Sequence, residues 1–187
     1  MHFQSLSIPE VKLITPKKFG DDRGYFSEVF KDGWFRESIA EVGFVQDNES
    51  LSRQIGTVRG LHFQLEPFAQ GKLVRCTRGA LFDVAVDIRV GSPTYGKWVS
   101  AELSSENGAQ LWVPAGFAHG FMTLKADTVI NYKVTAPYSA EHDRGLKWDD
   151  PTIGINWPKM KAYVLSEKDS KQPLLSELPV SFKYLKG

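Results

Sequence analysis

The chain has 187 residues, 42% of them hydrophobic, and 23 Lys and Arg against 22 Asp and Glu, for a formal net charge of +1. These values predict one globular domain over residues 1–187 and exclude the strong basic excess of a general nucleic-acid-binding protein. No apolar run approaches the roughly 20 residues of a membrane span and the N-terminus lacks a signal-peptide pattern, so we expect a cytoplasmic protein with no membrane partner.

Helical signals are few. The first is at residues 32–41, where a short helix is expected to end at Gly43. The second follows Ser166, near residues 167–169. The remaining signals favour strands.

The run 81–88 shows the clearest strand pattern. Its apolar residues at 82, 84, 86 and 88 alternate with Asp83 and Asp87. A period of two predicts a strand with one buried face and one solvent face.

Short strands with turns between them continue along the chain. Asn107-Gly108 is the strongest hairpin signal, because this pair accepts the positive φ angles of a type I′ turn. The other expected strands are 72–76, 98–103, 110–113, 120–125 and 128–134. Such spacing predicts an all-β sandwich or jelly-roll barrel.

Two of the four histidines occupy glycine-rich strand corners: His62 in the run 59–64 and His119 in the run 114–121. The period of two also indicates which side chains share one face of a strand. Lys72 shares a face with Val74, and Tyr132 shares a face with Ile130 and Val134. If these faces point inward, the barrel contains His62, Lys72 and Tyr132 in an apolar cavity, as in a small-ligand site.

The histidines could hold a metal or move protons. The spacing Pro114-x-Gly116-x-x-His119 resembles the second motif of the metal-binding cupins. The first motif is incomplete, because Gln64 follows His62 where a second histidine is needed and no glutamate follows at the expected spacing. Two histidines without further ligands make a poor transition-metal site, and the single cysteine, Cys76, excludes a multi-cysteine site. We therefore expect no metal.

Proton transfer needs a base, an acid on the opposite side and a cation to hold developing negative charge. His62, Tyr132 and Lys72 supply these three types of group. A carboxylate is also needed to fix the tautomer of His62. Asp83, Asp143 and Asp169 are all candidates, and periodicity does not choose among them.

Several motifs in a fixed order carry a specific family resemblance. They are residues 21–28 (DDRGYFSE), 46–50 (QDNES), 59–64 (RGLHFQ), 71–75 (GKLVR), 114–121 (PAGFAHGF), 132–133 (YK) and 165–169 (LSEKD). From about Lys17 to Lys171 the chain resembles the dTDP-4-dehydrorhamnose 3,5-epimerase family. The resemblance implies an all-β, cupin-type jelly-roll β-barrel with a few short helices, and an isomerase that uses no cofactor.

The resemblance also implies residue roles. The substrate would be dTDP-4-dehydro-6-deoxy-D-glucose, inverted at C3 and C5 to dTDP-4-dehydro-L-rhamnose. His62 would be the base, Asp169 its carboxylate partner, Tyr132 the acid that protonates C5, and Lys72 the group that stabilises the enolate at O4.

The same resemblance implies a set of substrate-binding residues and a homodimer. Phe26 and Tyr138 would contact the thymine, and the segment from Arg23 to Glu28 would reach the site of the other subunit. The full set is Arg23, Phe26, Glu28, Gln46, Asn48, Arg59, Lys72, His119, Tyr138, Asp143 and Lys168.

Three alternatives stay open from the sequence. The first is a related dTDP-sugar epimerase that acts only at C3 or only at C5. The second is a metal-dependent cupin, and the third is a cupin that binds a sugar without catalysis.

Overall fold

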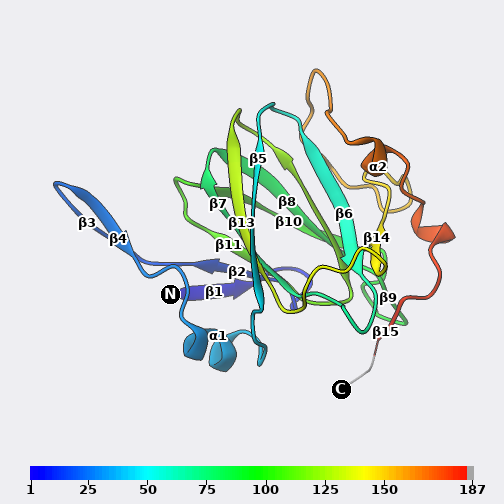
Figure 1. Cartoon of the computed structure of the whole chain (residues 1–187), viewed down its shortest axis with the longest axis horizontal. Coiled ribbons are helices and arrows are strands. Elements are labelled where there is room, and N and C mark those ends of the chain that lie inside the picture. The colour runs from blue at the N-terminus through cyan, green and yellow to red at the C-terminus, as the bar shows by residue number, and fades with distance from the viewer. Residues whose placement is uncertain (185–187) are drawn as a thin grey trace.

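The computed structural model describes residues 1–184 and consists mainly of two facing antiparallel β-sheets (Figure 1). The larger sheet has the strand order β1 (His2–Ser5), β2 (Lys12–Thr15), β11 (Gln110–Val113), β7 (Lys72–Arg78), β13 (Thr128–Val134) and β5 (Gln46–Ser52). The smaller sheet has the order β10 (Trp98–Ser104), β8 (Ala80–Asp87), β12 (Phe117–Thr123), β6 (Val58–Gln64) and β14 (Asp143–Gly145). This arrangement confirms the predicted all-β jelly-roll barrel.

The remaining elements are short and lie outside the barrel walls. They are the hairpin of β3 (Lys18–Asp21) and β4 (Gly24–Ser27), the helices α1 (Asp32–Ser38) and α2 (Glu167–Ser170), a 3₁₀ helix (Leu175–Glu177) and the parallel pair of β9 (Arg89–Val90) and β15 (Phe182–Lys183). No helix within residues 1–184 is long and apolar enough to cross a membrane.

The main core lies between the two sheets. Val74 and Leu111 from the larger sheet pack with Leu81, Ala85 and Phe121 from the smaller one, and each is at most 5% exposed. Burying a large aliphatic or aromatic side chain of this kind stabilises the fold by about 2 kcal/mol. The core therefore holds the two walls of the barrel at a fixed separation.

A second apolar layer covers the outer face of the smaller sheet. Val84 and Val86 of β8 pack with Leu61 of β6 and with Leu146 and Leu175 from the chain that follows β14. This C-terminal segment, orange to red in Figure 1, runs along the side of β6 and β14. The prediction that the run 81–88 has one solvent face is therefore wrong. The face with Asp83 and Asp87 lies inside the barrel, and the C-terminal segment covers the face with Val84 and Val86.

The two acidic residues of β8 are consequently buried, with 0% exposure for both Asp83 and Asp87. Asp87 accepts hydrogen bonds from Arg89 (2.7 and 2.9 Å), Ser92 (2.6 Å) and Thr94 (2.6 Å). These donors compensate for the loss of water around the carboxylate. They tie the turn after β8 to the end of that strand.

The hairpin predicted at Asn107-Gly108 is also wrong. β10 pairs with β8, whereas β11 pairs with β2 and β7, so the turn carries the chain from one sheet to the other. Gly108 has a φ angle of +64° but Asn107 has no positive φ, and a type I′ turn needs positive φ at both positions. Instead the Asn107 side chain accepts hydrogen bonds from the backbone N–H of Ser104 (3.0 Å) and Ala109 (2.9 Å).

Other predicted elements are present with adjusted bounds. The first helix ends at Ser38 rather than near Glu41, and the strand predicted at 120–125 begins at Phe117 and ends at Thr123. The strands at 110–113 and 128–134 and the short helix after Ser166 are confirmed. His119 therefore lies inside a strand rather than at its start.

Two glycines bring the backbones of β6 and β12 together where the histidines lie. A Cβ on Gly60 would lie 2.6 Å from the Cα of Gly120 and 2.7 Å from the carbonyl oxygen of His119. Gly60 also has a φ angle of +121°, which L side chains rarely adopt. The pairing shifts register at this point, and it places His62 directly opposite His119.

We predict that Gly60→Ala lowers the free energy of unfolding by about 3 kcal/mol, because the methyl group clashes with backbone and forces an unfavourable φ. Urea unfolding measures the effect. The control is Gly33→Ala in α1, where a Cβ meets nothing within 4 Å. This variant should raise the free energy of unfolding by about 0.5 kcal/mol. Equal stability of the two variants would contradict this account of the β6–β12 contact.

Candidate active site

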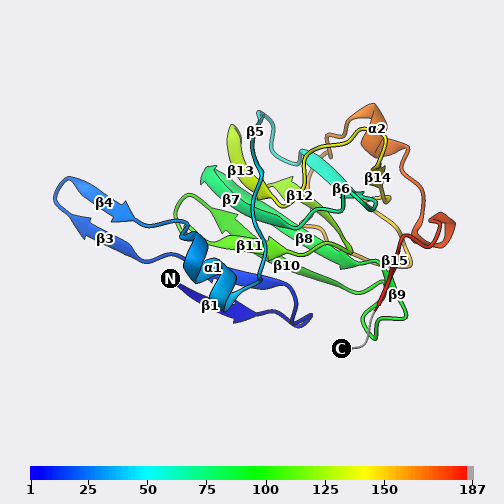
Figure 2. The ribbon, with the colours of Figure 1, turned by 60° about the horizontal axis from the view of Figure 1, so that its bottom comes forward.

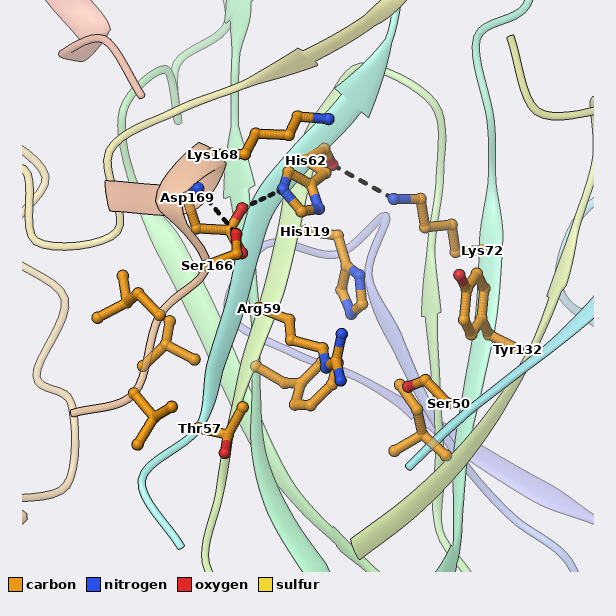
Figure 3. Close-up of a pocket in the computed structure, with 15 residues that line it drawn as sticks. Ser50, Thr57, Arg59, His62, Lys72, His119, Tyr132, Ser166, Lys168 and Asp169 are labelled. Carbon is orange, nitrogen blue, oxygen red and sulfur yellow. Dashed lines mark hydrogen bonds and ion pairs between the residues drawn. The ribbon is translucent and has the colours of Figure 1, made fainter. Parts of the chain in front are cut away.

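A cavity of about 480 Å³ lies in the barrel between β6 and β12 on one side and β7 and β13 on the other (Figure 3). Its polar lining includes both strand-corner histidines together with the predicted lysine and tyrosine. The lining residues are Ser50, Thr57, Val58, Arg59, His62, Lys72, His119, Phe121, Ile130, Tyr132, Val164, Leu165, Ser166, Lys168 and Asp169. The inward orientation predicted for His62, Lys72 and Tyr132 is therefore confirmed.

His62 forms a hydrogen bond with Asp169, the carboxylate partner that the family resemblance implied. The His62 Nε2 atom lies 2.5 Å from the Asp169 Oδ1 atom, and the two side chains are 31% and 6% exposed. Because the carboxylate accepts the Nε2–H, the lone pair of neutral His62 is on Nδ1. The pair thus presents a basic nitrogen with a fixed tautomer, as in a catalytic His–Asp pair.

Short-range contacts of the C-terminal segment explain how Asp169 reaches β6 from a position 107 residues away. Val164 pairs with the chain next to β6, because the backbone N–H of Val58 donates to its carbonyl oxygen at 2.8 Å. Ser166 then caps α2, and its hydroxyl oxygen accepts a hydrogen bond from the Asp169 N–H at 3.0 Å. The cap orients the first turn of α2 and directs Asp169 towards His62.

The environment of Asp169 keeps it ionised at neutral pH. Burial on its own would raise the pKa of this carboxyl group. The hydrogen bond and charge of His62, assisted by Ser166 and the backbone of Gly60, outweigh burial and hold the pKa below its usual value. An ionised Asp169 stabilises the imidazolium that forms when His62 takes a proton.

Tyr132 lies on β13, on the larger sheet, across the cavity from His62. Burial raises the pKa of its phenol, although the charge of Arg59 opposes part of this effect. The phenol is therefore protonated at neutral pH and can donate a proton into the cavity. Base and acid thus lie on opposite walls.

Lys72 lies on β7, and its Nζ donates a hydrogen bond to the carbonyl oxygen of His62 at 3.3 Å. Burial lowers the pKa of this amine to about 8, while the charges of Asp143 and Asp83 oppose the change. The amine is largely protonated at neutral pH. It is a cation positioned next to the base.

A second cavity of about 260 Å³ shares His62, Lys72 and Tyr132 with the first and extends it. Gln46, Asn48, Tyr138 and Asp143, all predicted to bind substrate, line it. The Gln46 side chain donates to the Asn48 side chain at 2.7 Å and accepts from the Tyr138 N–H at 3.1 Å. The two cavities together form one elongated site.

Cations lie along this elongated site. Lys168 forms an ion pair with Asp143, and the hydroxyl of Tyr138 donates to the same carboxylate at 3.2 Å. The Arg59 guanidinium donates to Ser52 Oγ and to the Leu51 carbonyl oxygen, both at 3.1 Å. Both cations are therefore held by contacts within the chain and are close enough to the cavity to meet an anionic ligand.

His119, predicted to bind substrate, belongs to a second His–Asp pair that sequence reasoning did not identify. Its Nε2 atom lies 2.7 Å from Oδ1 of Asp83. Asp83 is one of the three candidate partners for His62 in the sequence. The sequence therefore indicates Asp83 as a partner of a histidine, but the histidine that it contacts is His119. Among the apolar cavity residues, Leu165 lies in the family motif at 165–169, whereas Val164 has no sequence signal.

Three predicted substrate-binding residues are not at this cavity within the single chain. Arg23, Phe26 and Glu28 lie on or directly after the β3–β4 hairpin, which extends away from the barrel in both views (Figures 1 and 2). Phe26 is 70% exposed, and among residues 1–184 Arg23 forms an ion pair only with the neighbouring Asp21, at 2.5 Å. Their roles stay predictions that require a second chain.

Among residues 1–184, no three His, Cys, Asp or Glu side chains form a group that could hold a metal ion. What the described side chains do provide is a carboxylate-oriented base, a protonated phenol on the facing wall and a buried ammonium. These groups can remove a proton from carbon on one face of a ligand and return a proton to the other face.

Comparisons with known proteins agree with this chemistry. Residues 5–177 match the family described as dTDP-4-dehydrorhamnose 3,5-epimerase. The chain is 87% identical to the dTDP-4-dehydrorhamnose 3,5-epimerase of Sinorhizobium fredii over 186 residues, which cover 100% of this chain and 95% of that protein.

Solved structures share the fold over nearly the whole length. The dTDP-6-deoxy-D-glucose-3,5-epimerase of Legionella pneumophila, in complex with dTDP-4-keto-L-rhamnose, has a TM-score of 0.95 at 43% identity, covering 99% of each chain. The dTDP-4-dehydrorhamnose 3,5-epimerase of Bacillus anthracis, with TDP and PPi bound, has a TM-score of 0.89 at 45% identity, covering 92% of this chain and 98% of that one. This chain belongs to the dTDP-4-dehydrorhamnose 3,5-epimerase family.

Proposed function

We propose that this chain converts dTDP-4-dehydro-6-deoxy-D-glucose to dTDP-4-dehydro-L-rhamnose, a step of dTDP-L-rhamnose biosynthesis, by inverting C3 and C5. One observation carries the proposal: in a member of this family, the His62–Asp169 pair faces Tyr132 across a cavity that Lys72 also lines. A single residue serving as both base and acid would mainly return each proton to its origin. Groups on opposite walls produce inversion.

The substrate's own ketone makes the reaction possible. The C4 carbonyl acidifies the hydrogens on C3 and C5, and in a glucose-configured ring both of these hydrogens are on the same face. One base, Nδ1 of His62, can therefore remove either of them while Asp169 stabilises the resulting imidazolium. Because the ketone accepts the electron pair, the step requires neither a metal nor a redox cofactor.

The enolate is then stabilised and protonated by the facing groups. When the C–H bond breaks, its electron pair moves to O4, where the Lys72 ammonium holds the developing negative charge. Tyr132 next gives its hydroxyl proton to C5 from the opposite ring face and becomes a phenolate. His62 has gained one proton and Tyr132 has lost one, so the step balances.

The nucleotide part of the substrate would lie in the extended cavity. The diphosphate requires cations, and Arg59 and Lys168 are available to bind it. Gln46, Asn48, Tyr138 and Asp143 would bind the nucleoside, with the Tyr138 ring stacked on thymine. The cations along the cavity would thus bind a small anion rather than nucleic acid, in keeping with the net charge of +1 for the whole chain.

We further propose a homodimer in which the β3–β4 hairpin completes the partner's site. The hairpin exposes Phe19 (54%), Tyr25 (61%) and Phe26 (70%), which is unfavourable for a segment without a partner surface. Arg23 and Glu28 would reach the substrate of the other subunit from this hairpin.

The single buried thiol of Cys76 is compatible with a cytoplasmic location.

The main test is solvent-proton exchange during turnover. Incubation with dTDP-4-dehydro-6-deoxy-D-glucose in deuterated water should place deuterium at both C3 and C5 of the product, as measured by NMR. Deuterium at one carbon only would instead indicate a single-site epimerase, and binding without deuterium would indicate a non-catalytic cupin.

Two variants assign the base and the acid in the same assay. His62→Ala should reduce exchange at both carbons by about 10³- to 10⁴-fold, because the only base is lost. Tyr132→Phe should impair inversion at C5 more than proton removal from C5. Full exchange in His62→Ala, or unchanged C5 inversion in Tyr132→Phe, would remove the corresponding role.

The dimer is tested by mixing two inactive variants. His62→Ala lacks the base but has an intact hairpin, whereas Arg23→Ala has an intact base and a defective hairpin. If the hairpin acts on the partner, random subunit exchange should restore about a quarter of the wild-type sites. If the mixture stays as inactive as its two components, the hairpin does not act across a subunit interface.

Lys72 predicts an alkaline limit to activity. Its ammonium form is needed, and burial lowers its pKa to about 8, so kcat/KM should fall as pH rises above about 8. In Lys72→Arg the residual activity should lose this limb, since a guanidinium stays protonated. Lys125→Arg, at an exposed lysine, is the control, and an unchanged alkaline limb in Lys72→Arg would contradict the assignment.

A further inference from the structure

The mechanism so far leaves the second His–Asp pair with no chemical role. His119 and Asp83 are more deeply buried than His62 and Asp169, with side-chain exposures of 8% and 0%. Their contact, 2.7 Å between Nε2 and Oδ1, has the same form as the contact in the first pair. A buried pair of this kind at the cavity wall can store a proton.

The charge balance of Asp83 indicates where that proton is. Its Oδ2 atom is buried and has no hydrogen-bond partner among the described residues. A fully buried carboxylate with a single partner is costly unless the pair as a whole is neutral. In the ion-pair form, which is neutral as a whole, His119 is an imidazolium that donates Nε2–H to Asp83.

The second nitrogen of His119 is available to the cavity. Within residues 1–184, Nδ1 of His119 makes no hydrogen bond, and the residue lines the same cavity as His62 and Tyr132. His119 is the cross-strand partner of His62, and in Figure 3 its ring projects between His62 and Tyr132. The stored proton on Nδ1 thus belongs to a residue that lines the same cavity as the base and the acid.

Two inversions on one bound substrate create a need for such a group. After an inversion in which Tyr132 is the acid, His62 has one proton too many and Tyr132 has one too few. A second C–H cannot be broken until His62 is neutral again. This need follows from the proposed function, on which the inference rests.

We propose that the His119–Asp83 pair returns the proton from His62 to Tyr132 between the two inversions. The His119 imidazolium gives its Nδ1 proton to the Tyr132 phenolate, directly or through one water, and becomes neutral. Nδ1 then accepts the proton that the His62 imidazolium holds. The net result is one proton moved from His62 to Tyr132, with Asp83 ionised throughout.

The position of His119 excludes a simpler role as the acid for C3. β12 is the neighbour of β6 in the smaller sheet, so His119 and His62 face the ring from the same wall. A proton from His119 would restore the original configuration at the carbon. The pair can reset the catalytic groups but cannot perform an inversion.

The test compares the two inversions in one turnover. Wild type, His119→Asn and Asp83→Asn are each mixed, in separate reactions, with substoichiometric dTDP-4-dehydro-6-deoxy-D-glucose. The amounts of singly and doubly inverted product are then measured by NMR. The second inversion should slow by about 10²-fold in both variants, so that singly inverted product accumulates. Added imidazole should restore the second inversion, because a small base can replace a missing proton carrier but not a structural contact. His2→Asn, at the exposed strand β1, should behave as wild type.

Three results would overturn the inference. The first is an unchanged product ratio in His119→Asn with only KM raised, which would leave His119 as a binding residue. The second is accumulation of singly inverted product that imidazole does not restore. The third needs no variant. If the ratio of doubly to singly inverted product of the wild type rises with buffer concentration, solvent rather than His119 resets the site. Wild type that inverts neither carbon would instead reject the proposed function itself.

Discussion

The hydrogen bond between His62 and Asp169 is the interaction on which the site depends. It fixes the tautomer of His62, and so decides that Nδ1 is the basic nitrogen that faces the cavity. The interaction joins the middle of β6 to a helix near the end of the chain. The C-terminal segment must therefore fold across the smaller sheet before a base exists.

The barrel adds the second requirement, which is two separated walls. The core between the sheets holds β6 and β12 opposite β7 and β13, and thereby places the base and the phenol on different sides of any bound ring. Gly60 and Gly120 permit the close backbone approach that aligns His62 with His119. Each of these two histidines is engaged by its own carboxylate.

Much of this could be predicted from the sequence, because alternation along a strand is a local property. The strands at 110–113 and 128–134 follow from it directly, and so does the grouping of Lys72 and Tyr132 with the apolar residues on their strand faces. The partner of His62 could not be derived in this way, since Asp169 lies in a polar segment placed by contacts with distant strands. Only the family resemblance indicated it.

The errors have the same physical origin. The face of β8 that carries Asp83 and Asp87 lies inside the barrel, and Leu146 and Leu175, far along the chain, cover its apolar outer face. Alternation within the strand does not contain either of these contacts. The turn at Asn107-Gly108 has hairpin-type residues, yet the pairing of β10 and β11 is decided by other strands. Arg23, Phe26 and Glu28 lie on or directly after the β3–β4 hairpin, away from the cavity, so their substrate-binding roles stay predictions.

The most direct test of the central claim is the kcat of Asp169→Asn, measured together with its affinity for dTDP. The amide matches the carboxylate in size but can favour the wrong tautomer of His62 and cannot stabilise its cation. The account predicts a loss in kcat on the order of 10²- to 10⁴-fold with dTDP affinity unchanged. A variant that retains wild-type kcat would contradict the account, because the base would then work without the carboxylate that orients it.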